Sequence, residues 1–342
     1  MSQEAAFDVL SFGEALVDFL PSRMGARLRE IDHYTRCLGG APANLAYGVA
    51  MLGGRSAFMG RCGDDEFGYY LREKLQGAGV DVTGVTHTLE ARTGIVFIEI
   101  DEKGERSFTF YRHPSADSTI TAADVDLDVV RKSAIVHSGT NLMTLPGPRE
   151  ANLLVLSEAA EAGRLVSLDA NIRLHHWPDP DAVRESILHM LQLVDMLKVN
   201  EDETTFLFGQ GGTGREIFDR HLAPRQVSAL LMTLGGGGAT VITAQHEIHV
   251  AAPDVEVLDT TGAGDAFLAG ALRALSILLE PCGRGPGGWR QGLRELDEAQ
   301  WRSALSVANF AGASVCTSFG ATTAVPTLQD VPWERFGLPR PA

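Results

Sequence analysis

The residue types and spacing best suited to chemistry lie in one short segment, residues 259–265 (DTTGAGD). Gly262, Ala263 and Gly264 are small, which allows backbone amides to crowd against a ligand. The apolar stretch that follows predicts a helix, and a helix N-terminus binds anions, most readily phosphates. Asp265 would repel such an anion unless it has another task, and accepting a proton from an attacking hydroxyl is one. The segment therefore predicts phosphoryl transfer to an alcohol, in preference to an ordinary acidic helix start.

Two earlier segments offer polar groups for a substrate with several hydroxyls. Gly39 and Gly40 allow close backbone approach just before Asn44, whose side-chain amide both donates and accepts hydrogen bonds. Asp18 follows a predicted first strand, residues 9–13, at the edge where ligands bind in open α/β sheets. Each has a structural alternative, because Asn44 could cap a helix and Asp18 could be an ordinary solvated carboxylate.

Three later segments follow predicted strands and could serve phosphate groups. Arg173, in a loop that begins at Asp169, could clamp a phosphate or orient a carboxylate. Residues 200–203 (NEDE) could hold hydrated Mg²⁺ through water, or simply begin a helix. The glycine-rich residues 233–238 could let a nucleotide lie on the backbone, or form a hairpin loop. No glycine segment fits the dinucleotide fingerprint or the Walker sequence, which disfavours an NAD-dependent oxidoreductase and a P-loop enzyme.

The predicted elements place these segments along one sheet. Strands and helices alternate from residue 9 to residue 79, as in a mostly parallel sheet covered by helices. The predicted elements of this part are strands 9–13 and 55–60 and helices 44–52 and 67–79. Later strands are predicted at 134–137, 165–169, 196–199, 230–233 and 239–243, and two long helices at 265–280 and 298–317. Residues 281–292, rich in Gly and Pro, are interpreted as an exposed connector.

The middle of the chain departs from this alternation. Residues 93–100 and 106–111 read as strands on either side of a turn at 101–104 (DEKG). An antiparallel hairpin inside an α/β chain predicts a separate small sheet. Such a sheet could act as a lid or as a surface for a partner subunit.

Composition excludes several classes of protein. The chain has 342 residues, an apolar fraction of 44% and 21% charged residues, which favour a folded α/β protein. A net charge of −15 disfavours nucleic acid and anionic membranes as partners. The four cysteines show no Cys-x-x-Cys pair, and no apolar run reaches the roughly 18 residues that span a bilayer, so we expect a cytoplasmic protein. The adjacent His175 and His176 lack metal-ligand spacing and are interpreted as loop residues.

Taken together, these residues resemble the ribokinase-like (PfkB) carbohydrate kinases from residue 13 to residue 326. Two long signatures carry the resemblance: residues 39–46 (GGAPANLA), with Gly53 and Gly63 at the family's spacing, and residues 259–265. The resemblance implies a single kinase domain over residues 1–342, with a three-layer α/β/α fold. The lid strands would lie at approximately 14–37 and 92–116. The lid would also clasp a second subunit in a homodimer.

The resemblance implies a role for each matching residue. Asp265 would be the base that activates the sugar hydroxyl, with the amides of Gly262, Ala263 and Gly264 as the anion hole. The residues implied for the sugar are Asp18, Gly39, Gly40, Asn44 and Arg173. Those implied for ATP and Mg²⁺ are Asn200, Glu203, Thr233, Gly235, Gly238 and Asn309. The backbone of Asp259 and Thr261, with the turn at 316–320, resembles a monovalent cation site for which K⁺ is the candidate.

Substrate choice rests on finer likeness. Residues 13–19, 110–117 and 169–173 look most like fructokinases. Aminoimidazole riboside kinases share the His-Pro-x-Ala-Asp pattern, and 2-keto-3-deoxygluconate kinases share Asp-x-Asn-x-Arg, so these rank second and third. A non-catalytic sugar or nucleotide sensor on the same fold is the alternative of a different class. The sequence departs from the family at Gly236 and Gly237, where a polar residue is common, at His176, and at residues 318–320 (SFG).

Overall fold

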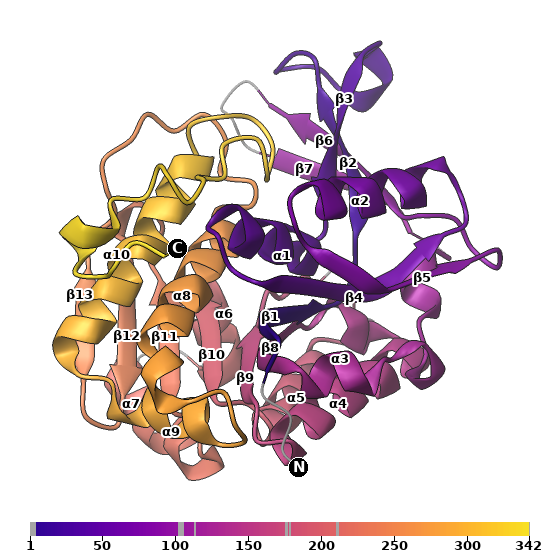
Figure 1. Cartoon of the computed structure of the whole chain (residues 1–342). Helices are drawn as coiled ribbons and strands as arrows, with labels where there is room; N and C mark the ends of the chain where they lie inside the picture. Colours follow the sequence, from indigo (N-terminus) through magenta and orange to yellow (C-terminus); the bar gives the residue numbers. More distant parts are fainter. Residues whose placement is uncertain are drawn as a thin grey trace.

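The computed structural model describes residues 5–101, 106–112, 114–174, 177, 179–209 and 212–341. Two β-sheets organise this part of the chain (Figure 1). The larger has nine strands in the order β13-β12-β11-β10-β9-β8-β1-β4-β5, and the smaller has four in the order β3-β2-β6-β7. In the larger sheet the neighbours from β11 to β5 pair in parallel, while β12 pairs antiparallel with β11 and with β13. The predicted fold, a mostly parallel sheet with a small β-sheet lid, is confirmed.

The bounds of the elements follow the predicted alternation. The strands of the larger sheet are β1 (Phe7–Phe12), β4 (Ser56–Gly63), β5 (Asp81–Thr88), β8 (Ser133–Gly139), β9 (Leu165–Asp169), β10 (Met196–Asn200), β11 (Ala229–Thr233), β12 (Ala239–Thr243) and β13 (Glu247–Val250). The helices are α1 (Ala41–Met51), α2 (Glu66–Gly77), α3 (Leu127–Arg131), α4 (Pro146–Glu161), α5 (Pro180–Met190), α6 (Glu201–Phe208), α7 (Gly214–Ile217), α8 (Ala263–Leu278), α9 (Gly288–Glu295) and α10 (Glu298–Val315).

Helices cover both faces of the larger sheet. Along β1, Val9 packs into a core formed with α1, α8 and α10, whereas Leu10 and Phe12 pack into a second core formed with α4 and α5. The same alternation recurs in the neighbouring strands, so the central strands are buried on both sides, as parallel strands usually are. The result is three layers, with α8 packed between α1 and α10 (Figure 1).

The smaller sheet projects from one end of the larger sheet, and we call its four strands the lid. They are β2 (Leu16–Pro21), β3 (Tyr34–Gly39), β6 (Ile95–Ile100) and β7 (Arg106–Tyr111). Strand β2 pairs antiparallel with β3 and parallel with β6, and β6 pairs antiparallel with β7. The predicted hairpin is thus confirmed in its strands, while residues 102–104 of its turn lie outside the described residues. The stacked rings of Phe19 and Phe97, with centroids 5.0 Å apart, join β2 to β6.

One predicted connector is wrong. Residues 281–292 were expected to be exposed, but α9 begins at Gly288 and buries Trp289 and Leu293. These two residues stand four apart on one helix face and pack into the core of α8 and α10, which gives the segment a reason to fold.

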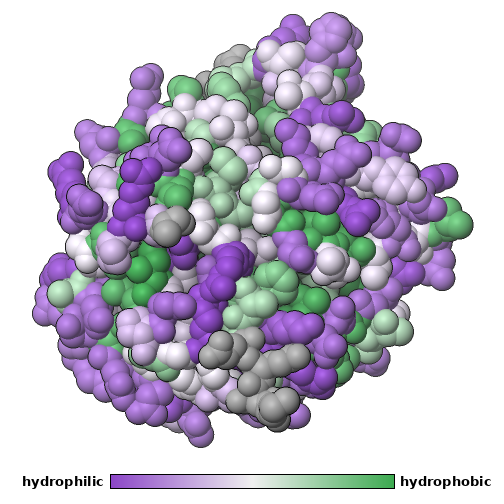
Figure 2. Space-filling model, in the orientation of Figure 1, coloured by the Kyte–Doolittle hydropathy of each residue, from purple (hydrophilic) through white to green (hydrophobic). Residues whose placement is uncertain are grey.

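The surface agrees with the composition. The face seen in Figure 1 is mostly hydrophilic, and its hydrophobic residues form separate patches (Figure 2). Among the described residues, no helix has the length and apolar character needed to cross a membrane.

Candidate active site

A pocket of about 900 Å³ lies between the lid and the ends of several strands of the larger sheet. Leu16, Val96 and Phe108 of the lid line one side of it, and Asp169, Asn200 and Thr233, at strand ends, line another. Every residue predicted for the site lines this pocket except Gly39 and Asp259. A volume of this size is at the upper end of the roughly 300–1,000 Å³ of small-molecule sites, which suits two ligands side by side.

The Gly-Ala-Gly turn leads into α8, a helix of 16 residues. Gly262 has φ +78°, and a Cβ atom there would lie 2.5 Å from Cβ of Ala321, so only glycine fits. The Ala263 amide donates to the carbonyl of Thr260 at 3.2 Å, which occupies one of the three amides predicted for the anion hole. The amides of Gly262 and Gly264 have no backbone acceptor among the described residues. They point to an anion site at the positive end of the α8 dipole.

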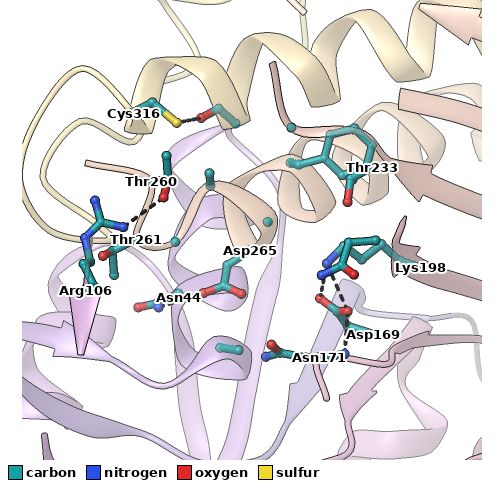
Figure 3. A pocket seen from close by; sticks show the side chains of 18 of the residues that line it. Asn44, Arg106, Asp169, Asn171, Lys198, Thr233, Thr260, Thr261, Asp265 and Cys316 are labelled. Carbon is teal, nitrogen blue, oxygen red and sulfur yellow. Dashed lines mark hydrogen bonds and ion pairs between the residues drawn. The ribbon is translucent and has the colours of Figure 1, made fainter. Parts of the chain in front are cut away.

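Asp265 lies in the first turn of α8 and faces the pocket. Its Oδ2 accepts a hydrogen bond from Nδ2 of Asn44 at 2.9 Å, a contact between residues 221 positions apart (Figure 3). Burial raises the pKa of Asp265 to about 7, and the Asn44 hydrogen bond and the charges of Lys198 and Arg173 act in the opposite direction. A carboxylate with such a pKa changes its charge near neutral pH, which suits a general base.

Asp18 reaches the pocket from β2 of the lid. Its carboxyl group lies against Gly39 on β3, where a Cβ atom would be 2.3 Å from Cγ of Asp18. Burial, followed by the charges of Asp265 and Asp259, raises the pKa of Asp18 to about 7. Gly39 does not line the pocket, and its place in the site is to leave room for Asp18.

Gly39→Ala is therefore expected to act through Asp18. The added methyl group displaces the carboxyl, and a displacement of about 1 Å can cost about 10²-fold in rate. We expect kcat/KM for the hydroxyl substrate to fall by about 10- to 10²-fold while KM for the phosphate donor stays within about twofold. Steady-state kinetics with each substrate varied in turn checks this split, and Gly77→Ala, where a Cβ meets no atom within 4 Å, is the control. A rise in KM for the phosphate donor of similar size would contradict it.

Two polar side chains that the sequence analysis missed lie at the lid end of the pocket. Oε1 of Glu14 accepts a hydrogen bond from Nδ2 of Asn141 at 2.7 Å, and burial raises the pKa of Glu14. Oδ1 of Asn141 and Oδ1 of Asn44 are buried without a partner in the described residues. Such acceptors are satisfied when a ligand hydroxyl donates to them. Asn141 follows β8 just as Glu14 follows β1, so the rule on strand ends could have found both residues.

Lys198 is a third residue that the sequence analysis missed. It lies directly opposite Asp169 in the pairing of β9 and β10, and its Nζ contacts Oδ2 of Asp169 at 3.1 Å and Oδ1 at 3.2 Å (Figure 3). A Cβ atom at Gly264 would lie 3.3 Å from Nζ, so the ammonium group borders the anion turn. Burial opposes the charge of Lys198, but the carboxylates of Asp169 and Glu203 raise its pKa. A lysine buried in a strand needs a partner of opposite charge. The lysine within the predicted strand 196–199 was therefore the signal in the sequence.

Asn200 and Glu203 form a capping box at the start of α6. Oδ1 of Asn200 accepts from the amide of Glu203, and Oε2 of Glu203 accepts from the amide of Asn200, both at 2.8 Å. Oε1 of Glu203 accepts from the amide of Ile172 at 2.8 Å, so both oxygens are engaged. Within the described residues, no three His, Cys, Asp or Glu side chains gather as metal ligands. Asn200 and Glu203 therefore tie the start of α6 to the loop after β9.

The far end of the pocket is open and rich in glycine. Gly235 and Gly238 lie in the hairpin between β11 and β12, and a Cβ at Gly235 or Gly236 would meet no atom within 4 Å. Nδ2 of Asn309 on α10 donates to the carbonyls of Val250 at 2.8 Å and Ala251 at 3.3 Å, which fixes the chain after β13. This end leaves room for a flat ring along the backbone. Thr233 and Asn309 both line it.

The remaining predicted residues lie at two borders of the pocket. Arg173 is exposed and lines the pocket beyond Asp169. The carboxyl of Asp259 is buried behind the anion turn and is engaged by the amides of Thr261 and Gly320 and by Arg106 of the lid. His175 and His176 lie outside the described residues.

Known proteins are similar to this chain in sequence and in fold. Residues 6–328 match the pfkB family carbohydrate kinase profile. The chain is 37% identical over 337 residues to probable fructokinase-6, chloroplastic, of Arabidopsis thaliana, which covers 96% of this chain and 82% of that protein. A fructokinase structure from Xylella fastidiosa with bound ATP superposes with a TM-score of 0.84 at 31% identity, over 94% of this chain and 96% of that one.

Two further structures carry other ligands. A fructokinase variant from Vibrio cholerae O395, in a form with fructose, ADP and potassium ion bound, superposes with a TM-score of 0.79 at 32% identity, over 95% of this chain and 96% of that one. The aminoimidazole riboside kinase of Salmonella enterica, complexed with aminoimidazole riboside and an ATP analogue, gives a TM-score of 0.77 at 31% identity, over 96% and 98% of the two chains.

Proposed function

The chain belongs to the pfkB family of carbohydrate kinases, and we propose that it is a fructokinase that transfers the γ-phosphoryl group of ATP to D-fructose. The position of Asp265 carries this proposal. Asn44 holds the carboxyl of Asp265 beside the amides of Gly262 and Gly264. This carboxyl lies between the polar end and the glycine-rich end of the same pocket. A sugar hydroxyl and a terminal phosphate would meet there, beside the carboxylate that takes the proton. The whole chain would act as a single kinase domain.

We assign each group a step in the transfer. Asp265 accepts the hydroxyl proton while the Gly262 and Gly264 amides and the start of α8 stabilise charge on the phosphoryl oxygens. Lys198, on the other side of Gly264, adds a positive charge there. Mg²⁺ would neutralise further phosphate charge, and the exposed carboxylates of Glu201 and Asp202 line the pocket where they could hold its water ligands. Val96 and Phe108 of the lid line the same pocket and help to exclude water.

The polar end of the pocket favours a neutral polyol. Asp18 and Glu14 lie there, and the guanidinium of Arg112 is paired with Asp117. A 2-keto-3-deoxygluconate carboxylate would meet two carboxyl groups there, and Arg173, which lines the pocket beyond Asp169, is the cation that it would need to reach, so this substrate ranks third. Aminoimidazole riboside stays the second candidate, because it is neutral and because the Salmonella enterica kinase shares the fold at a TM-score of 0.77.

ADP release measured against fructose, aminoimidazole riboside, 2-keto-3-deoxygluconate and ribose tests the assignment. We expect the highest kcat/KM with fructose. A preference for another sugar would contradict the substrate and leave the kinase intact. If none of the four sugars led to ADP release but calorimetry detected sugar binding, the non-catalytic sensor would be the better assignment.

The pH dependence of kcat/KM follows from the pKa of Asp265. Only its ionised form accepts a proton, so kcat/KM for the sugar is expected to fall below a pKa of about 7 and to level off above it. Asp18 has a raised pKa of about 7 as well, so the acidic limb reports the two carboxyl groups as a pair. Asn44→Ala removes a hydrogen bond that favours ionised Asp265, and this should move the limb about one unit to higher pH. Profiles from pH 5 to 9 check the position of the limb, and identical limbs in both proteins would contradict this role of Asn44.

The lid also offers a surface for a second subunit. Tyr111 of β7 is 59% exposed, and its ring packs edge-on against Phe97 on the face of the lid opposite Phe108 and the pocket. We propose that a homodimer covers this face, which light scattering of the purified protein would detect. All four cysteines are unpaired, in keeping with a reducing compartment such as the cytoplasm.

A further inference from the structure

One face of α10 lines the glycine-rich end of the pocket. The residues that line it recur at helix spacing and end in the C-terminal cap of α10: Asn309, Gly312, Ala313 and Cys316. Gly312 and Ala313 carry little or no side chain, so a flat ring has room beside the helix. The thiol of Cys316 donates to the carbonyl of Gly312 at 3.3 Å (Figure 3). Asn309 is thus the residue of this face whose polar side chain can meet a ligand.

The orientation of the Asn309 amide is fixed by the backbone after β13. Its Nδ2 donates to the carbonyls of Val250 at 2.8 Å and Ala251 at 3.3 Å. A carbonyl only accepts, so the amino group must face these two oxygens and Oδ1 must point away from them. Gly238 holds the same segment from the hairpin side, because its φ is +97° and a Cβ atom there would lie 2.6 Å from the amide nitrogen of Ala252. Because the segment is held on both sides, the Asn309 amide keeps this orientation.

Oδ1 of Asn309 is an acceptor without a donor in the part of the chain that the structure describes. It accepts no hydrogen bond there, while Asn309 is 5% exposed and lines the pocket. A nearly buried acceptor is costly unless a ligand donates to it. Adenine carries such a donor in its 6-amino group, whereas hypoxanthine and guanine carry a carbonyl at that position. Oδ1 would bond the first base and repel the other two.

We propose that Asn309 selects the base of the phosphate donor, with Oδ1 accepting a hydrogen bond from the 6-amino group of adenine. The neighbouring hairpin cannot supply this selectivity through side chains, because Gly235, Gly236 and Gly238 have none. Asn309 acts on the binding of the base and not on the reacting atoms, so it determines donor specificity and is not a catalytic residue. The inference rests on the proposed kinase function, in which ATP is the donor.

The test compares nucleoside diphosphate release from three donors at saturating fructose. They are ATP, ITP, in which a carbonyl replaces the 6-amino group, and purine riboside triphosphate, which has neither group. For the wild-type protein, kcat/KM is expected to be about 10- to 10²-fold higher with ATP than with ITP, and purine riboside triphosphate should lie between them. The difference should appear in KM and not in kcat, because the base does not touch the phosphoryl group. Equal kcat/KM for ATP and ITP would overturn the proposal.

Asn309→Leu tests the residue itself. Leucine has a similar volume but no acceptor, so the ratio of kcat/KM for ATP to that for ITP should fall to within about threefold. The control is Arg302→Met, because Arg302 is also on α10, donates to the carbonyl of His249 at 3.3 Å and does not line the pocket. It should keep the ratio of the wild-type protein. An equal loss with ATP and ITP in Asn309→Leu would mean that Asn309 only supports residues 250–251, and this would contradict the proposal.

Calorimetric binding of ADP and IDP gives a second readout that does not depend on activity. The wild-type protein is expected to bind ADP about 10- to 10²-fold more tightly than IDP, and Asn309→Leu should bind the two alike. Equal affinity of the wild-type protein for both would overturn the proposal, whether or not the variant folds. If no donor supported turnover with any sugar, the kinase function would fail, while the affinities for ADP and IDP would still decide the role of Asn309.

Discussion

Asp265→Asn is expected to lower kcat by about 10²- to 10⁴-fold, the usual contribution of a general base. Asparagine has nearly the same shape, so it can keep a hydrogen bond with Asn44, but it cannot take the proton of the attacking hydroxyl. The amides of Gly262 and Gly264 stay in place, so ATP binding should change little. A kcat near that of the wild-type enzyme would remove Asp265 from the mechanism.

The same substitution makes a prediction about stability that separates lost chemistry from lost fold. Burial raises the folded-state pKa of Asp265 to about 7, above the value of about 3.9 in unfolded chains. A carboxyl group with a raised pKa stabilises the fold most below its unfolded pKa, and this stability is lost as the pH rises through about 7. Asparagine has no such dependence, so Asp265→Asn should unfold at a higher temperature than the wild-type protein at pH 8, and the difference should shrink at pH 5.

A matched carboxylate provides the control for both measurements. Asp128 also lies in the first turn of a helix, α3, but it is 70% exposed and does not line the pocket. Asp128→Asn should leave kcat unchanged and lower stability only slightly, through the lost interaction with the helix dipole. If both variants lost activity alike, the effect of Asp265→Asn would be general and not catalytic.

Most of the larger sheet could be predicted because its strands are buried on both faces. Such strands read as continuous apolar runs, and those predicted within residues 134–243 all correspond to strands β8 to β12. Two strands at the edges of the sheet were missed. In β5 (DVTGVTHT) a glycine interrupts an alternating, half-exposed pattern, and β13 (EIHV) has four residues. Both are paired on one side, so their sequences need not be apolar throughout.

In the candidate site, too, some features could be predicted from the sequence and others could not. Asp265, Asn44 and the glycine turns belong to local signatures, and a local signature is visible in a sequence. The hydrogen bond from Asn44 to Asp265 was not predicted, because it joins residues 221 positions apart. Likewise, Lys198 meets Asp169 only because β9 and β10 are neighbours in register. These contacts depend on strand order and helix packing, which no short segment encodes.

Lys198→Met is expected to lower the free energy of unfolding by about 3–5 kcal/mol, because it leaves the buried Asp169 carboxylate without its cation. The two side chains are 7% and 5% exposed, so water cannot replace the lost partner. Denaturant unfolding monitored by fluorescence measures this. The control is Arg302→Met, which breaks an exposed pair with Glu298 and should cost less than about 1 kcal/mol.

The double variant Asp169→Asn/Lys198→Met separates the two tasks of the ion pair. Removing both charges should restore stability to within about 1–2 kcal/mol of the wild-type protein, since the Asp169 carboxylate is no longer buried without its cation. Activity should not return, because the ammonium group that borders Gly264 is still missing, and we expect kcat/KM for ATP to stay about 10²-fold low. A double variant that regains activity along with stability would mean that Lys198 only balances Asp169. If stability recovers and turnover does not, Lys198 contributes to the positive charge that stabilises the phosphoryl group during transfer.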